Sequence, residues 1–205
     1  MNKKTHWETV YQTKSDQQVS WYRDHLDNSL RMILNTKVGK DAAIIDVGGG
    51  SSTLADDLLD NGFADISVLD ISASAMKKSQ ARLGSQAKQI EWLEADITNV
   101  SLPKNYYDIW HDRAVFHFLT DAEDRQKYVK LVMNSLKIGG HIIVASFGEN
   151  GPLKCSGLDV VRYSPETMHN EFGNEFKLIK SLNETHQTPF GTTQEFIYCY
   201  CRKLF

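Results

Sequence analysis

The sequence has few cysteines, no long apolar run and no excess of basic charge. Three cysteines occur in 205 residues. Cys199 and Cys201 alternate with other residues inside an apparent strand, so we expect them to face opposite sides of a sheet and to stay reduced. No stretch of about 18 apolar residues could span a bilayer, and the first residues lack the apolar core of a signal peptide. These absences predict a cytoplasmic protein with no membrane partner.

Basic charge is also too sparse for a nucleic-acid partner. The formal net charge is −3, and lysines are mixed with acidic residues rather than gathered in a stripe. The 41% hydrophobic and 24% charged residues are typical of an ordinary globular domain, and no repeat, low-complexity tract or linker divides the chain. We therefore predict a single domain over residues 1–205 that does not bind nucleic acid.

Short apolar segments alternate with helical patterns from about Ala42, as in βαβ units with a parallel sheet. The last two strands follow each other without a helical crossover, which predicts an antiparallel hairpin at the sheet edge. The predicted strands are Ala42–Val47, Asp65–Leu69, Gln89–Glu94, Tyr107–His111, His141–Phe147, Phe176–Leu182 and Glu195–Cys201. The predicted helices cover Leu54–Asp60, Ala73–Leu83 and a run from Asp121 to Leu136 that stops at Gly139–Gly140, with another opened by Ser164, Pro165 and Glu166.

A glycine run follows the first predicted strand and precedes a helix. Glycines at 48, 49 and 50 allow a sharp turn and the close approach of a ligand, which lies beyond the carboxyl ends of the strands in an open α/β sheet. Asp70 ends the second predicted strand, where a carboxylate can accept hydrogen bonds from ribose hydroxyls. The two motifs together predict a nucleotide-type site rather than a mere tight turn.

Charge distinguishes between possible ligands of this site. Asp46 lies beside the glycine run, where it would repel a pyrophosphate but suit a sulfonium or an amino group. Thr53 takes the place of the third glycine of a dinucleotide fingerprint. The pattern favours a cationic adenosine ligand over NAD, although an NAD-dependent oxidoreductase stays an alternative.

Three segments resemble signature motifs of class I S-adenosylmethionine-dependent methyltransferases: Ile45–Ser52, Val68–Ser72 and Glu94–Thr98. The resemblance implies a Rossmann-like, doubly wound, mostly parallel seven-stranded sheet with an antiparallel final strand. It also implies S-adenosylmethionine as the cofactor, with S-adenosylhomocysteine as the product. On this basis residues 1–40 are a cap segment, 41–147 the cofactor-binding core, and 148–205 a substrate loop, a helix and the terminal hairpin.

The resemblance also assigns roles to individual residues. Gly48, Gly49 and Gly50 would face the methionyl part of the cofactor, with Asp46 near its amino group. Asp70 would hold the ribose. Ile71 would pack on the adenine, Asp96 would accept its amino group, and Ile97 would lie nearby. As an alternative, Asp96 is an ordinary turn carboxylate.

The segment from Tyr107 to Phe118 should reach the transferred methyl group. His111 is the first candidate for a catalytic proton acceptor and for a contact with the cofactor, and His117 is the second candidate acceptor. Arg113 either pairs with Asp112 or binds an anionic substrate. The string from Asp112 to Ala114 resembles thiopurine-type and other small-molecule methyltransferases, and also some elongation-factor lysine methyltransferases. Either histidine could instead be a buried structural residue.

The loop from Gly148 to Leu158 is a possible substrate wall. Lys154 next to Cys155 would lower the pKa of its thiol, although a single loop cysteine is usually inert. Tyr163 and the stretch His186–Gly191 are further possible walls. No metal is assigned to the site.

Several functions remain open for this site. The leading hypothesis is in-line methyl transfer to an N, O or S nucleophile of a small molecule. A protein lysine methyltransferase is the alternative, and Asp108, Asp112 and Glu149 could supply the acidic channel that it would need. A cofactor-binding protein without catalysis is the third possibility.

Overall fold

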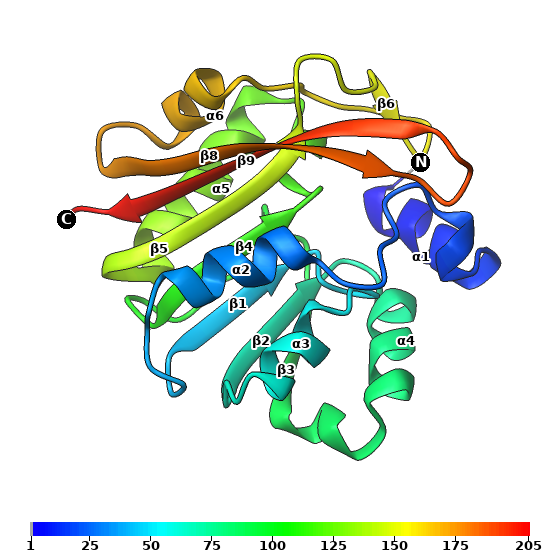
Figure 1. Ribbon diagram of the computed structural model, residues 1–205, viewed down its shortest axis with the longest axis horizontal. Coiled ribbons are helices and arrows are strands. Elements are labelled where there is room, and N and C mark those ends of the chain that lie inside the picture. The colour runs from blue at the N-terminus through cyan, green and yellow to red at the C-terminus, as the bar shows by residue number, and fades with distance from the viewer. Residues whose placement is uncertain (1) are drawn as a thin grey trace.

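A central seven-stranded sheet with helices on both faces forms the protein (Figure 1). The computed structural model describes residues 2–205, apart from the side chain of Asp16. The strand order is β3-β2-β1-β4-β5-β9-β8. The strands are β1 (Ala43–Val47), β2 (Asp65–Asp70), β3 (Ile90–Glu94), β4 (Tyr107–Arg113), β5 (Leu136–Phe147), β8 (Phe176–Gln187) and β9 (Thr193–Lys203), and a separate hairpin pairs β6 (Lys154–Cys155) with β7 (Leu158–Asp159).

One strand of the sheet, β9, runs against all the others. β1 pairs in parallel with β2 and β4, β2 with β3, and β4 with β5. β9 then runs antiparallel to both β5 and β8. The predicted Rossmann-like α/β fold, with its terminal antiparallel hairpin, is therefore confirmed.

Local sequence signals account for several helix ends. The Ser72 hydroxyl accepts a hydrogen bond from the Ala75 N–H at the start of α4, and a capping box at Ser164 starts α6. At the end of α5 the buried Lys203 ammonium donates to the carbonyls of Met133 and Leu136. The helices are α1 (Lys3–Thr13), α2 (Asp27–Asn35), α3 (Leu54–Asp60), α4 (Ala73–Leu83), α5 (Ala122–Ser135) and α6 (Pro165–Phe172), with 3-10 turns η1 (Asp16–Gln18), η2 (Gly84–Gln89) and η3 (Phe116–Phe118).

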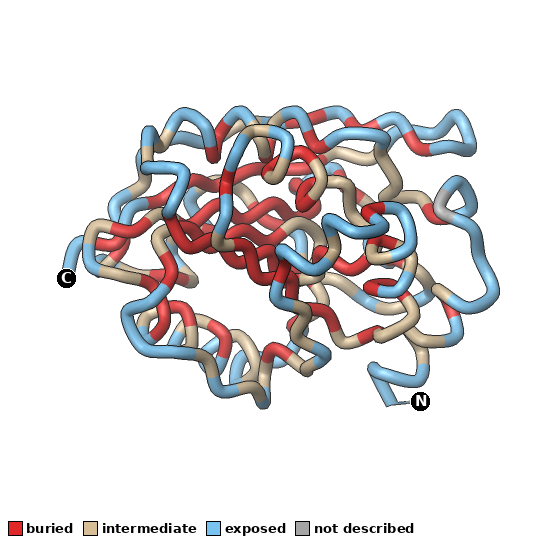
Figure 2. The backbone as a smooth tube through the Cα atoms, turned by 90° about the horizontal axis from the view of Figure 1, so that it is seen from below, coloured by how far each residue is buried: buried red, intermediate tan, exposed pale blue. Residues whose placement is uncertain are grey.

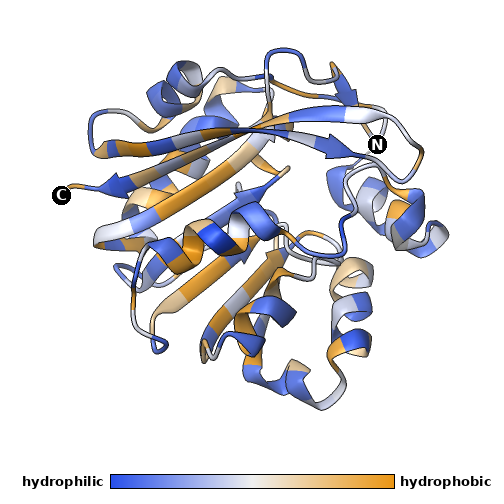
Figure 3. Cartoon of the chain, in the orientation of Figure 1, coloured by the Kyte–Doolittle hydropathy of each residue, from blue (hydrophilic) through white to orange (hydrophobic). Residues whose placement is uncertain are grey.

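Two hydrophobic layers enclose the sheet. α2 and α3 pack on one face, where Ile33 and Leu58 contact residues of the central strands. α5 and α6 pack on the other face through Tyr128, Val132 and Met168. The strands β1 and β2 are buried along most of their length (Figure 2), and β1 is apolar except at Asp46 (Figure 3). A strand that is covered on both faces has no solvent-exposed side, so its sequence lacks the alternation of apolar and polar residues and is a continuous apolar run.

Two local predictions are wrong. Cys199 and Cys201 lie on the same face of β9, with their Sγ atoms 3.5 Å apart, because residues two positions apart on a strand share a face. Both are free thiols. Gly139 and Gly140 do not end a helix: α5 stops at Ser135 and the chain passes directly into β5, so these glycines lie within the strand.

The N-terminal segment lies partly at the end of the sheet where the parallel strands finish. There α1 packs against α4 (Figure 1), whereas α2 packs on a sheet face and belongs to the core. Within residues 2–205, no helix is long and apolar enough to cross a membrane.

Candidate functional site

The loop after β1 has no room for a side chain at any of its three glycines, and at Gly49 a Cβ would lie 2.2 Å from the Asp46 Oδ2. Gly48 has a φ of +72°, and a Cβ there would lie 2.0 Å from Cγ2 of Val115. A Cβ at Gly50 would lie 2.5 Å from both the Ala75 Cβ and the Asp70 Oδ2. The turn and the close approach of the backbone to Asp70 therefore both require glycine.

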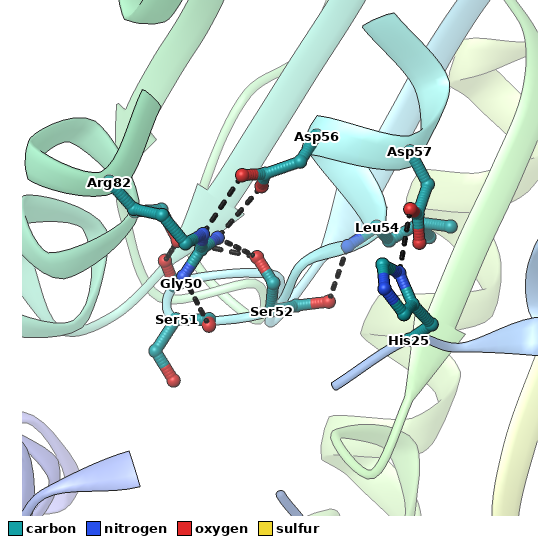
Figure 4. Close-up of polar contacts among 9 residues, drawn as sticks. His25, Gly50, Ser51, Ser52, Leu54, Asp56, Asp57 and Arg82 are labelled. Atoms are coloured by element: carbon teal, nitrogen blue, oxygen red, sulfur yellow. Dashed lines mark hydrogen bonds and ion pairs between the residues drawn. The ribbon is translucent and has the colours of Figure 1, made fainter. Parts of the chain in front are cut away.

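Arg82 of α4 contacts the backbone of this loop, as Figure 4 shows. Its guanidinium donates to the carbonyls of Ser51 and Ser52 and pairs with Asp56 at 2.8 Å. The Gly50 carbonyl accepts from the Ser79 hydroxyl at 2.7 Å. The loop is thus fixed on the side that faces α4, and its other side faces a cavity.

Asp46, the last residue but one of β1, has one carboxylate oxygen without a hydrogen-bond partner among the described residues. Its Oδ1 lies 2.7 Å from His111 Nδ1, whereas its Oδ2 is buried and has no hydrogen-bond partner among the described residues. His111 is fully buried, and its Nε2 lies 2.8 Å from the Ser29 hydroxyl on α2. Both ring nitrogens of His111 are therefore occupied, which makes it an orienting group for Asp46.

Asp70 ends β2 and receives two backbone hydrogen bonds. The Gly50 N–H donates to Oδ2 at 3.0 Å, and the Ser72 N–H donates to Oδ1 at 2.8 Å. Burial nevertheless raises the pKa of Asp70 to about 6, because desolvation of the charged form outweighs these hydrogen bonds.

The third strand contributes a carboxylate of a different kind. Asp96 follows β3, and its Oδ1 accepts from both the backbone N–H and the hydroxyl of Thr98. It is thus the turn carboxylate of the alternative interpretation and at the same time a residue of the cavity wall. Ile71 and Ile97 also line the cavity.

One continuous cavity connects these residues with the N-terminal segment. We call its two parts the glycine-loop end and the aromatic end. The glycine-loop end comprises Asp46, Gly48–Gly50, Asp70, Ile71, Asp96 and Ile97. The aromatic end comprises Trp7, Trp21, Arg113, Phe118 and Cys155; all of these residues except Gly50 line the cavity itself.

The aromatic rings come from three separate segments. Trp7 of α1 packs edge-on against Trp21 at 5.6 Å and against Phe118 of η3 at 5.1 Å between ring centroids. Tyr11 lies between this group and the glycine-loop end, and its hydroxyl accepts from Trp21 Nε1 at 3.3 Å. α1 therefore closes the cavity through Trp7 and Tyr11.

Arg113 stands at the end of β4 and anchors the N-terminal segment. Its guanidinium donates to the Trp21 carbonyl at 3.1 Å and to the Tyr198 hydroxyl at 3.3 Å, and it stacks on Phe196. Its side chain is only 5% exposed. It does not pair with Asp112, whose carboxylate accepts instead from Tyr128 and from the backbone of Val115 and Phe116.

His117 does not line the cavity that the described residues form. It is fully buried and packs against Phe118 and Phe147. Burial, with a smaller effect from Arg113, lowers its pKa to about 3. His117 is therefore a neutral histidine within the core.

The expectation of a low pKa for Cys155 is wrong. Its thiol does reach the aromatic end, but burial raises its pKa to about 12. Lys154 does not lower that pKa, because it is exposed and pairs with Asp159 at 3.2 Å on the opposite strand of the β6–β7 hairpin.

The other predicted walls lie elsewhere. Tyr163 is buried among the aromatic residues near Phe116. His186 contacts the Ser20 carbonyl through Nε2, and the stretch after it borders a separate surface groove.

No acidic channel leads into the aromatic end among the described residues. Asp108 accepts from the Ala43 N–H and pairs with Lys137, near the start of β4. Asp112 is fully buried, and Glu149 does not line the cavity formed by residues 2–205. The acids that do line it are Asp46, Asp70 and Asp96, which all belong to the glycine-loop end. Within the described part of the chain, no group of three or more His, Cys, Asp or Glu residues is placed to hold a metal ion.

Sequence reasoning missed the residues that support Arg113 and His111 from distant parts of the chain. Ser29 reaches His111 from α2, and Glu184 reaches both Arg23 and Arg113 from β8. No local motif marks these residues, because their roles arise only when α2 and β8 fold against β4.

Comparison with known proteins gives a consistent family. Residues 45–144 match the model of a methyltransferase domain. The chain is 26% identical over 200 residues to human EEF1A lysine methyltransferase 2, an alignment that covers 91% of this chain and 78% of that protein. It is 27% identical over 155 residues to the mouse eEF1A lysine and N-terminal methyltransferase, covering 73% of this chain but only 22% of that longer protein.

Solved structures share the fold. One, solved in work on the conversion of a disulfide bond into a thioacetal group during echinomycin biosynthesis, has a TM-score of 0.80 at 13% identity and covers 99% of this chain and 93% of its own. The N-methyltransferase NodS from Bradyrhizobium japonicum, in complex with S-adenosylhomocysteine, has a TM-score of 0.70 at 14% identity and covers 98% of this chain and 99% of its own. With a glycine loop and strand-end carboxylates on this fold, the chain is a class I S-adenosylmethionine-dependent methyltransferase.

Proposed function

We propose that the protein transfers the methyl group of S-adenosylmethionine to a nucleophilic N, O or S atom of a small molecule. The observation that carries this proposal is the aromatic end itself. It is walled by Trp7, Trp21 and Phe118, and no carboxylate is among its described residues. A pocket of aromatic rings that contains a guanidinium and no carboxylate suits a small molecule better than a lysine ammonium group, which would need a negative partner.

The residues of the glycine-loop end fit the cofactor. The free Oδ2 of Asp46 is a buried acceptor that the cofactor's amino group would satisfy. Gly48 and Gly49, which line the cavity, would face the methionyl part. Asp70 would bind the ribose hydroxyls with the lone pairs that its two backbone donors leave free. Ile71, Asp96 and Ile97 would surround the adenine.

The cofactor supplies an electrophilic methyl group on a sulfonium, so the protein's task is to hold the acceptor in line with the carbon–sulfur bond. The sulfur would keep the electron pair of that bond, so the step would require no group of the protein to take up the leaving group. His111 would act as a positioning residue, since hydrogen bonds to Asp46 and Ser29 occupy both its nitrogens. The acceptor therefore has to present its own lone pair, and any proton that it loses leaves without this histidine.

A second candidate function is lysine methylation on a protein, which the curated relatives favour. The two functions can be separated by incubating the purified protein with radiolabelled S-adenosylmethionine and cell extract, then dividing the products by size. We expect the label in a small-molecule product that chromatography resolves from S-adenosylmethionine itself. Label confined to a protein band would contradict the proposal in favour of the second candidate.

A further inference from the structure

The positive charge of Arg113 and Arg23 is only partly neutralised. Glu184 of β8 lies 2.7 Å from Arg23 Nη1 through its Oε1, and its Oε2 accepts from the Asn28 side chain. Arg113 Nη2 lies 3.6 Å from the same Oε1, too far for a hydrogen bond. Two guanidiniums thus share the Glu184 carboxylate, whose oxygens are already engaged, and only Arg23 has a second partner, Asp27 Oδ2 at 3.9 Å.

Arg113 keeps an unused donor in a buried position. Nη2 is fully buried and has no hydrogen-bond partner within residues 2–205, while Nη1 and Nε donate to Trp21 and Tyr198. The guanidinium is held flat against Phe196, with its carbon 4.4 Å from the ring centroid. A buried donor without a partner is costly, and a charged one more so, which indicates a missing ligand.

The charges around Arg113 would allow an anion to bind there. Arg113 and Arg23 both line the cavity, and no carboxylate accepts a hydrogen bond from Arg113 within the described residues. Apart from Glu184 and Arg23, the titratable groups near Arg113 shift toward their neutral forms: burial and Arg113 lower the pKa of His117 and His186, and burial raises that of Cys155. A fixed guanidinium in such a dry pocket is a strong partner for an anionic oxygen.

We infer that Arg113 forms an anion subsite for the methyl acceptor, which is therefore a planar small molecule carrying an anionic oxygen. The aromatic rings of Trp7, Trp21 and Phe118 would enclose its planar part. This inference rests on the proposed function and narrows its substrate class. It also fits the lack of a free base, because an acceptor ionised beside a guanidinium needs no histidine to remove its proton.

Three probes with one ring and different charge test the subsite: benzoate, benzamide and benzylamine, titrated by NMR into protein saturated with S-adenosylhomocysteine. We expect benzoate to bind about fivefold or more tighter than benzamide, the effect of one charge-assisted hydrogen bond, and benzylamine to bind least. Arg113→Met should reduce benzoate binding to the benzamide level. The matched control Arg202→Met changes an exposed arginine at the far end of β9 and should leave binding unchanged.

Glu184→Gln provides a second variant in case Arg113→Met fails to fold. It removes the shared carboxylate charge while keeping a side chain of similar size, so benzoate should bind several-fold tighter. The subsite is refuted if benzoate has no advantage over benzamide, if none of the probes binds, if benzylamine binds best, or if Glu184→Gln weakens benzoate. Failure of S-adenosylhomocysteine itself to bind would instead refute the proposed function.

Discussion

The glycine-loop end and the aromatic end of the cavity are built from different parts of the chain. The glycine-loop end uses residues at the ends of β1, β2 and β3, each within a few positions of a strand. The aromatic end gathers Trp7 and Trp21 from the N-terminal segment, Arg113 and Phe118 from around β4 and η3, and Cys155 from β6. The first is a property of the sheet, and the second depends on how distant segments pack over it.

The two ends also differ in charge and in how they are held. Asp46 and Asp70 make the glycine-loop end acidic, and short contacts to His111, Gly50 and Ser72 fix them. The aromatic end is closed by α1, whose outer contacts are exposed, such as Lys3 with Asp124. Exposed ion pairs contribute little, so we expect the aromatic end to open more easily than the glycine-loop end.

The largest effect on cofactor affinity should come from adding a side chain to the glycine loop. In Gly50→Ala the new Cβ would collide with Ala75 and Asp70, and we expect S-adenosylhomocysteine affinity to fall about a hundredfold or more, with a stability loss of about 1–3 kcal/mol. Gly62→Ala is the matched control: Gly62 has a positive φ but open space around it, so it should cost stability without changing affinity. Calorimetric titration with thermal unfolding measures both quantities. Equal affinities in the two variants would show that the loop does not approach the cofactor.

Removing the negative charge of Asp46 should have the next largest effect on cofactor affinity. Asp46→Asn keeps the shape of the side chain but loses the partner of a cationic amino group, which should weaken S-adenosylhomocysteine about tenfold to a hundredfold. Asp112→Asn is the comparison, because this aspartate is equally buried but bonded to Tyr128 and the η3 backbone. It should lower the unfolding midpoint and leave affinity nearly unchanged. A larger affinity loss in Asp112→Asn than in Asp46→Asn would reverse the assignment of the two aspartates.

A pH dependence should appear at the glycine-loop end. Because burial raises the pKa of Asp70 from 3.8 to about 6, its protonated form is favoured in the folded protein, and the stability that this adds is lost as the pH rises through about 6. Cofactor affinity should change in the opposite direction, falling by up to about tenfold per pH unit below that value, since the ribose needs the carboxylate. Affinity titrations across this range, with urea unfolding of wild type and Asp70→Asn, test both slopes. A flat affinity profile would argue against a role for the Asp70 charge.

The smallest effect on cofactor affinity should come from the aromatic end. Trp7→Ala removes the ring that joins α1 to Trp21 and Phe118, so α1 should exchange its amide hydrogens faster while S-adenosylhomocysteine affinity changes only about threefold. Trp92→Ala, at a part-buried tryptophan on β3 whose indole donates to Ala87, serves as the control and should leave exchange in α1 unchanged. Hydrogen-exchange mass spectrometry reports the difference. Unchanged exchange in Trp7→Ala would mean that other contacts hold the helix.

The same division explains what could be predicted from the sequence. The order of strands and helices follows from local apolar runs and caps such as Ser72 and Ser164, and the strand-end aspartates from their place after those runs. The two cysteines of β9 were misplaced by an error in applying the strand period, not by missing information. The prediction that Gly139 and Gly140 end a helix is wrong because α5 passes into β5 without the turn that glycines usually mark.

The aromatic end could be anticipated only as a set of residue types. The sequence predicts a cap segment over residues 1–40, yet nothing local indicates that Arg113 would bond to Trp21 or share Glu184 with Arg23. The contacts of each histidine likewise depend on how distant segments pack. His111 and His117 lie only six positions apart, but one contacts two polar groups and the other is buried among phenylalanines.

The most direct test of the account is calorimetric titration of S-adenosylhomocysteine into wild type and Asp70→Asn. Asparagine preserves the size of the side chain but not its charge, and its amide nitrogen cannot accept the hydrogen bond that Gly50 or Ser72 donates to the present carboxylate. We predict micromolar binding by the wild type and a loss of about a hundredfold in the folded variant, from two charge-assisted hydrogen bonds. Equal affinity in the two proteins would contradict the assignment of the glycine-loop end as the cofactor site.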